Sequence, residues 1–206
     1  MYDDGVAVPA REQVEPAEIS GYAADNLLYI RQAMERSSTF TSIPGIGGAL
    51  MGVVALIAAA VAGAQQTSER WLLTWIAAAI VAATVGLVTM GLKAKRAGST
   101  LTGATAKRFA LGMAAPFVAG AAITFQLWSV GAYAVMAPAW LLLYGAGVLT
   151  GGIFSVPIVR VIGVCFMMLG VLAIATPSAW GNLWLAAGFG GLQVAFGAYI
   201  ARHHGG

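Results

Sequence analysis

The residue types that most often carry chemistry are missing from the long apolar stretches of this chain. All eight carboxylates lie between Asp3 and Glu69, and the two histidines, His203 and His204, stand at the C-terminus. General acid–base catalysis needs His, Asp, Glu or Lys side chains within hydrogen-bond reach of a substrate, and buried metal or haem sites need ligands inside the fold. The sequence therefore predicts no catalytic residues, no metal site and no cofactor, and it indicates a protein that is not an enzyme.

The composition places the chain in a membrane. Of its 206 residues 59% are hydrophobic and 9% are charged, whereas a soluble domain has about 25% charged residues. A membrane-spanning helix needs about 20 apolar residues, and six such runs use nearly all of the chain after Ile43. We predict an all-α polytopic membrane protein with six transmembrane helices arranged as three hairpins.

The apolar runs and their flanking polar residues set the expected bounds of the six helices. Ser42 is expected to cap the first helix, with Pro44 near its first position. Pro116 is expected to kink the third helix, and a neighbouring helix can satisfy the carbonyl that this proline frees. The expected helices run over 42–64, 71–92, 109–128, 138–154, from 155 to about 175, and 182–201.

The N-terminal residues have a different composition from the spans. Residues 1–17 are acidic and contain two prolines, which predicts a disordered arm. Residues 18–41 carry Leu27 and Ile30 at helical spacing, which predicts an amphipathic juxtamembrane helix. This helix would lie on lipid headgroups, pack on a partner, or cover the loops of its own bundle. The expected bundle occupies 42–202, and 203–206 form a short tail.

The distribution of cations predicts the orientation. With the N-terminus inside, Arg70 would face outside and the other ten Lys and Arg residues would face inside, as the positive-inside bias requires. All six tryptophans then fall at the outer interface, although they were no part of the cation count. We therefore expect a bacterial cytoplasmic (inner) membrane protein with both termini in the cytoplasm. Because the cations face lipid headgroups, the net charge of +3 does not indicate a nucleic-acid partner.

Three polar residues are candidates for contacts with an anion, a lipid or a polar solute. Arg160 would bind a lipid phosphate or another anion, or it would anchor the inner end of the fifth helix. Gln193 and Gln126 would line a polar path, or each would make a hydrogen bond between helices.

Small residues predict close helix approach. The pairs Gly48/Gly52 and Gly147/Gly151 each form a GxxxG motif, which lets two helix backbones come together within one chain or between chains. Met167 and Met168 are expected to pack rather than to bind copper. Cys165 has no second cysteine in the chain with which to form a disulfide.

Two resemblances rest on short segments. The sequence from Tyr29 to Ser38 leading into Ser42–Gly45, and the Gly188–Leu192 segment with its Ala201-Arg202 ending, resemble uncharacterised six-span membrane proteins of bacteria. The last hairpin, with Leu169-Gly170-Val171, Pro177 and Phe196-Gly197, is similar in its Gly and Pro spacing to acid-resistance membrane proteins of the HdeD type. Both resemblances imply three membrane hairpins, and the first implies no known activity.

The sequence leaves two functional hypotheses. The first is a non-enzymatic membrane protein that serves as a structural, assembly or regulatory subunit. Its partners would be membrane lipids and either a membrane protein complex or a second copy, bound through residues 18–41 or the GxxxG faces. The alternative is an uncoupled channel or carrier for a small neutral solute or lipid, lined by Gln126 and Gln193.

Overall fold

The computed structural model describes residues 26–30, 40–98 and 102–203. The chain divides into two compact units, Met1–Ser38 and Thr39–Gly206. In the first unit residues 26–30 are helical, and Leu27 and Ile30 are exposed. The expected arm at 1–17, most of the amphipathic helix at 18–41, and 204–206 of the tail lie outside the described residues.

The second unit contains six helices that are long and apolar enough to cross a bilayer, counted over the described residues. The chain is therefore an integral, multi-pass membrane protein of the all-α class, as predicted. Five spans are formed by α2 (Gly45–Gly63), α3 (Ser68–Arg96), α4 (Ala104–Ser129), α5 (Met136–Gly152, after the 3₁₀ turn Tyr133–Val135) and α6 (Pro157–Ile174). The sixth consists of a 3₁₀ turn at Ser178–Trp180, α7 (Gly181–Leu185), a π-helix at Ala186–Leu192 and α8 (Gln193–His203).

The first span begins later than predicted. Pro44, with an extended backbone (φ −81°, ψ 120°), occupies the N-cap position of α2, so Ser42 is not the N-cap residue. The residues before it are held in another way. The backbone N–H of Phe40 donates to the carbonyl of Phe154 at 2.7 Å, and the Ser155 hydroxyl donates to the carbonyl of Phe40. This pairing keeps residue 40 in a short parallel bridge beside the α5–α6 turn.

Helices α3 and α4 extend beyond their predicted bounds. The last turn of α3 includes Lys93, Lys95 and Arg96, and positive side chains are favourable at the C-terminal end of a helix. Gly98 follows this end with φ +62°. The turn after α4 has the Schellman pattern, because the N–H of Ala132 bonds the carbonyl of Leu127 and Gly131 adopts φ +72°.

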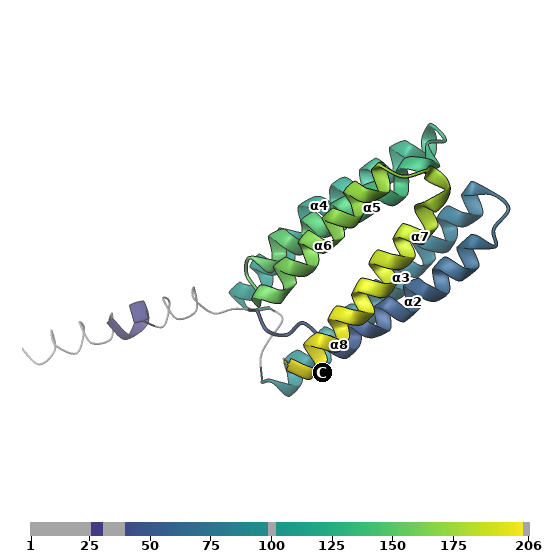
Figure 1. Cartoon of the computed structure of the whole chain (residues 1–206). Helices are drawn as coiled ribbons and strands as arrows, with labels where there is room; N and C mark the ends of the chain where they lie inside the picture. Colours follow the sequence, from purple (N-terminus) through teal and green to yellow (C-terminus); the bar gives the residue numbers. More distant parts are fainter. Residues whose placement is uncertain (1–25, 31–39, 99–101, 204–206) are drawn as a thin grey trace, which may run out of the picture. The chain divides into compact units, whose positions relative to one another are not determined.

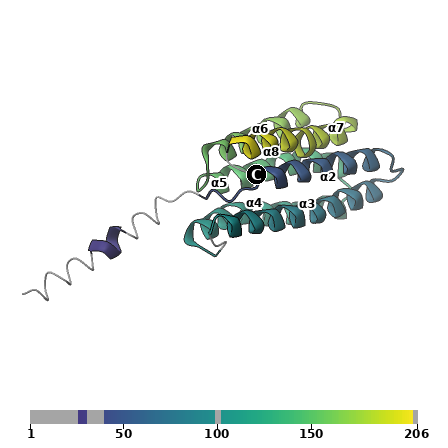
Figure 2. The same ribbon diagram turned by 90° about the horizontal axis from the view of Figure 1, so that it is seen from below.

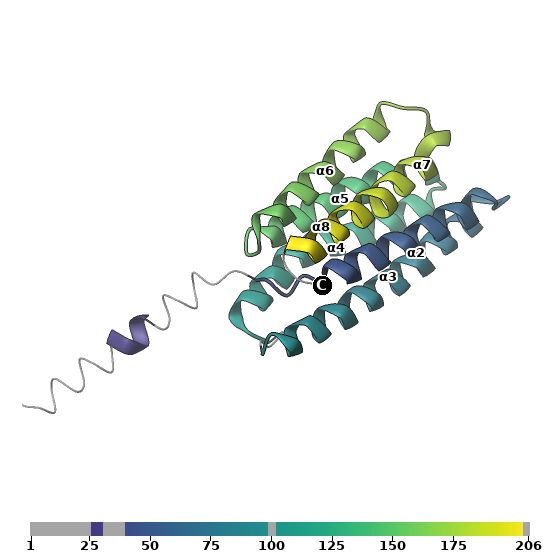
Figure 3. The ribbon, with the colours of Figure 1, turned by 60° about the horizontal axis from the view of Figure 1, so that its bottom comes forward.

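The six spans pack as two sets of three. In one set α5 lies between α4 and α6, and in the other α2 lies between α3 and α8 (Figure 1). Most of the helix contacts of the bundle occur within these two sets. Figure 2 and Figure 3 show the same order from other directions, with α2 between α8 and α3. The two sets meet mainly through α7 and the π-helix, which contact α5 and α6.

The third hairpin does not pack as a hairpin. Although α6 is followed at once by α7 and α8, the main partner of α6 is α5 and the main partner of α8 is α2. Glycines explain this choice, because a Cβ on Gly163 would lie 2.6 Å from the backbone N of Leu149, and one on Gly197 would lie 2.3 Å from that of Ala49. The packing is therefore not threefold, although an aromatic pair four residues apart stands near the start of α3 (Trp71 and Trp75), α5 (Trp140 and Tyr144) and the sixth span (Trp180 and Trp184).

The π-helix at Ala186–Leu192 aligns the two ends of the sixth span. The Asn182 side chain bonds Ala59 of α2, and Val194 packs on Gly52 of the same helix. At 3.6 residues per turn, twelve residues of uninterrupted α-helix would place these side chains about 120° apart. A π-helix bonds i to i+5 and so rotates less per residue. The π stretch thereby brings Asn182 and Val194 to one face.

Candidate functional site: polar contacts and the basic end

Asn182 joins three helices with one carboxamide. Its Nδ2 donates to the carbonyl of Ala59 in α2 at 2.8 Å, and its Oδ1 accepts from the indole N–H groups of Trp75 at 3.1 Å and Trp71 at 3.3 Å. The Trp71 ring also stacks on Trp140 of α5, with ring centroids 5.6 Å apart. Trp71 and Trp75 therefore serve as hydrogen-bond donors inside the bundle, and Trp71 also as a packing group.

Gln193 lies against an aromatic cluster at the centre of the bundle. Its Nε2 donates to the hydroxyl oxygen of Tyr144 at 3.0 Å. The Tyr144 ring packs on Phe166 and Phe189, with centroids 4.7 and 4.9 Å away, and on Phe117 at 5.8 Å. This contact joins the sixth span to α5, so the structure places Gln193 in a hydrogen bond between helices.

Thr150 supplies the hydrogen bond that Pro116 removes. A proline at 116 cannot donate to the carbonyl four residues before it, which belongs to Gly112. The Thr150 hydroxyl of α5 lies 2.6 Å from that carbonyl, nearer than the carbonyls of Ala146 and Gly147 in its own helix at 2.8 and 3.1 Å. We therefore assign its single proton to the carbonyl of Gly112. A Cβ on Gly112 would lie 2.9 Å from the Cα of Gly151. The α4–α5 contact thus has room for the hydroxyl and satisfies the freed acceptor, as the sequence predicted for a neighbouring helix.

The other two candidate residues lie on the surface. Gln126, in the last turns of α4, is exposed, and its carboxamide makes no hydrogen bond within the described residues. Arg160, in the first turn of α6, is also exposed. Gln126 and Gln193 do not face a common path, so their placement gives the carrier hypothesis no support.

Both glycine pairs are used within the chain. Gly52 lies where a Cβ would meet the backbone N of Val194 at 2.7 Å, and Gly48 lies beside Gly197. In α5, Gly147 and Gly151 accommodate side chains of α4, because added Cβ atoms would meet Phe117 at 2.9 Å and Met113 at 2.7 Å. These four glycines therefore contact neighbouring helices of the same bundle.

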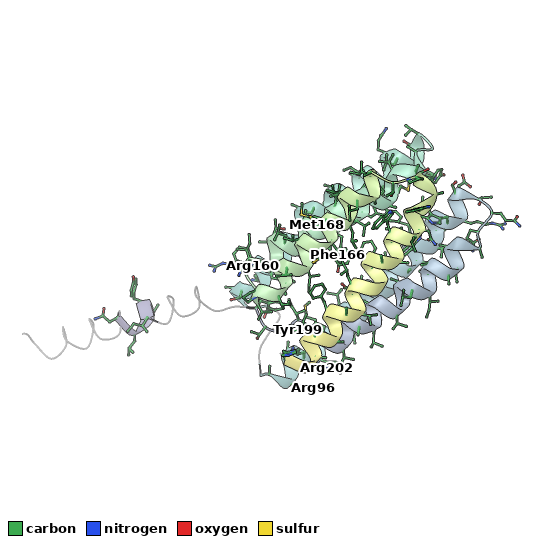
Figure 4. All side chains as sticks on the ribbon, in the orientation of Figure 1. Arg96, Arg160, Phe166, Met168, Tyr199 and Arg202 are labelled. Carbon is green, nitrogen blue, oxygen red and sulfur yellow. The ribbon has the colours of Figure 1, made fainter. Side chains whose placement is uncertain are left out.

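Charge divides the bundle into two ends. We name the basic end by its cations, which are all the described Lys and Arg residues except Arg70: Lys93, Lys95, Arg96, Lys107, Arg108, Arg160 and Arg202. Figure 4 labels Arg96, Arg160 and Arg202 at this end. The tryptophan end carries the turns before α3, α5 and α7, together with Arg70 and Glu69, the single carboxylate of the described residues.

Inside the bundle the polar side chains are satisfied. Within the described residues, no side-chain N or O atom is buried without a hydrogen-bond partner. Trp140 donates to the Thr124 hydroxyl at 2.8 Å, and Trp184 donates to the Thr176 hydroxyl at 2.7 Å. His203 contacts its own helix, with Nδ1 2.9 Å from the carbonyl of Tyr199.

Sequence reasoning found Gln193 but missed Asn182, Thr150 and Tyr144. A signal existed for Asn182, since a carboxamide stood between Trp180 and Trp184 at the start of an apolar run. For Thr150 the signal was a hydroxyl inside a glycine pair, opposite a helix that contains a proline.

Comparisons of the chain with protein families, with curated proteins and with solved structures find no match. The two resemblances seen in the sequence stay predictions.

Proposed function

We propose that this chain is a non-enzymatic structural, assembly or regulatory subunit of the bacterial cytoplasmic membrane that binds other membrane components. The observation that carries the proposal is the use of the interior polar groups. Asn182, Thr150 and Gln193 each bond a neighbouring helix, and the spans hold no carboxylate except Glu69 in the first turn of α3. Such an interior supports a fixed scaffold.

One span has an apolar surface that its own bundle leaves open to lipid or to a partner helix. Helix α4 contacts mainly α5, and in its most apolar 18 residues no residue is buried. Residues 1–38 carry seven of the eight carboxylates, a composition unlike that of the spans. With both termini in the cytoplasm, these acidic residues would meet partners on the inner side.

A crosslinking experiment tests the proposal. The full chain, tagged and expressed from its own promoter, is crosslinked in intact cells before extraction in mild detergent. The matched variant lacks residues 2–38 and keeps Phe40, because Phe40 bonds the α5–α6 turn. We expect a discrete complex that the truncation removes while the melting temperature of the bundle stays unchanged. A crosslinked chain that runs as a monomer in both forms would overturn the proposal.

A further inference from the structure

We propose that the basic ends of α3 and α4 each form a saturable binding site for an anionic phospholipid, with the lipid phosphate held by Lys95 and Arg96 on α3 and by Lys107 and Arg108 on α4. This inference rests on the membrane insertion of the bundle and not on the proposed role as a subunit. All four side chains are exposed, and they belong to two consecutive helices joined by residues 97–103.

The positive charge of these four residues is not balanced by carboxylates in the rest of the described bundle. Glu69 is the single carboxylate of the described residues, and it stands in the first turn of α3, at the opposite end of a 29-residue helix. None of the four cations forms an ion pair with a described residue. Four cations beside the headgroup layer create a positive potential that attracts anionic lipids, and each Lys or Arg contributes about 1 kcal/mol to such attraction.

The helix faces next to these cations match the shape of a lipid. On α3, Val88, Leu92 and Lys95 follow one another at i, i+4 and i+7, so they share one face. Val88 and Leu92 are 55% and 50% exposed. An acyl chain lying on this apolar stripe would bring its phosphate to Lys95.

Helix α4 repeats the arrangement with the opposite chain direction. Arg108, Leu111 and Ala115 follow at i, i+3 and i+7, and Leu111 is 72% exposed. These are also the two least buried spans, since 11% of the most apolar stretch of α3 is buried and none of that of α4. Each helix therefore presents an open apolar stripe that ends in a cation at the basic end.

The test uses the purified full chain in zwitterionic detergent. Native mass spectrometry counts bound dioleoyl phosphatidylglycerol in competition with dioleoyl phosphatidylcholine. We expect phosphatidylglycerol to saturate at a small number of molecules and to be preferred over phosphatidylcholine. Arg108→Gln should weaken phosphatidylglycerol binding by about fivefold, the equivalent of one surface charge. Equal binding of the two lipids would overturn the proposal.

A matched control separates a local site from net charge. Arg70→Gln removes the same charge at the tryptophan end and should leave phosphatidylglycerol binding unchanged, whereas Arg108→Lys should retain most of it. A loss with Arg70→Gln equal to that with Arg108→Gln would contradict the assignment. Displacement of the lipid by inorganic phosphate or glycerol phosphate at the same concentration would also contradict the assignment, because the site would then bind any soluble phosphate.

Combined substitution gives a second readout that does not depend on mass spectrometry. The chain with Lys95, Arg96, Lys107 and Arg108 all changed to Gln should lose the rise in melting temperature that phosphatidylglycerol gives the wild type, since a ligand stabilises the state that it binds. Its melting temperature in phosphatidylcholine should match that of the wild type. An undiminished rise with phosphatidylglycerol would overturn the proposal, even if the subunit role were correct.

Discussion

Single polar side chains form hydrogen bonds between helices in this protein, and among the described residues Asn182 forms the most of them. Its carboxamide bonds α2 and two tryptophans of α3. Hydrogen bonds between membrane helices contribute about 0.6 kcal/mol each, with a maximum of about 1.7 kcal/mol. Three bonds that share one residue therefore make Asn182 a stability determinant of the tryptophan end.

We expect Asn182→Leu to lower the free energy of unfolding in micelles by about 1–2 kcal/mol, because two indole N–H groups lose their acceptor. Steric-trap or denaturant unfolding measures this change. Gln126→Leu is the matched control, because this carboxamide is exposed and makes no described hydrogen bond, and it should change stability by less than about 0.5 kcal/mol. Equal effects of the two substitutions would contradict the assigned role.

Thr150 and Pro116 should be coupled. Thr150→Val keeps the side-chain shape and removes the donor to the carbonyl of Gly112, which should cost about 1 kcal/mol. In a Pro116→Ala background the backbone N–H of residue 116 can bond that carbonyl, so the same Thr150→Val substitution should cost less. A double-mutant cycle measures the coupling energy. A coupling of zero would show that the hydroxyl does not replace the missing backbone bond.

At the scale of the element, glycines determine which helices become neighbours. Gly197→Ala places a Cβ 2.3 Å from the backbone N of Ala49, and such overpacking costs about 1–3 kcal/mol. Gly191→Ala in the same span is the control, because its nearest atom is the carbonyl oxygen of Ala186 at 4.0 Å. Thermal unfolding should separate the two variants. A Gly197→Ala protein as stable as the control would contradict the close α2–α8 contact.

The π stretch makes an unusual prediction for deletions. Removing Gly191 leaves eleven steps from Asn182 to Val194, which an uninterrupted α-helix would turn to within about 20° of alignment. We therefore expect this deletion to fold, with the Asn182 and Val194 contacts kept. Removal of Ala195, which follows Val194, rotates Gly197 relative to Val194, so only one of these two residues can keep its contact with α2. This deletion should therefore lower the stability more than the deletion of Gly191. Melting temperatures of the two deletions compare them, and the reverse order would contradict the phase argument.

At the scale of the whole molecule, the charged ends predict the orientation in the membrane. Seven described cations lie at the basic end and Arg70 at the tryptophan end. In a Cys165→Ser background, Gln66→Cys marks the tryptophan end and Ala97→Cys marks the basic end. A membrane-impermeant maleimide added to intact spheroplasts should label the first cysteine and spare the second until the cells are lysed. The opposite pattern would reverse the proposed orientation.

The sequence determined the number and the type of the helices. A bilayer core about 30 Å thick requires runs of about 20 apolar residues, and it forbids unsatisfied backbone, so the six runs had to be helices. The cations and tryptophans at the ends of the runs likewise indicated which helix ends lie at the same end of the bundle. These properties depend on local composition, which the chain displays directly.

Tertiary structure alone decided which helices are neighbours. Hairpin order suggests that α6 and α8 pack together, yet α6 packs on α5 and α8 on α2. Lipid tails are as apolar as the helix surfaces, so hydrophobicity does not choose between partners. The choice of neighbouring helix depends on how closely the backbones approach at Gly163 and Gly197. It also depends on whether a side chain such as Asn182 or Thr150 reaches a hydrogen-bond acceptor on the neighbouring helix. Those distances exist only once the helices are assembled.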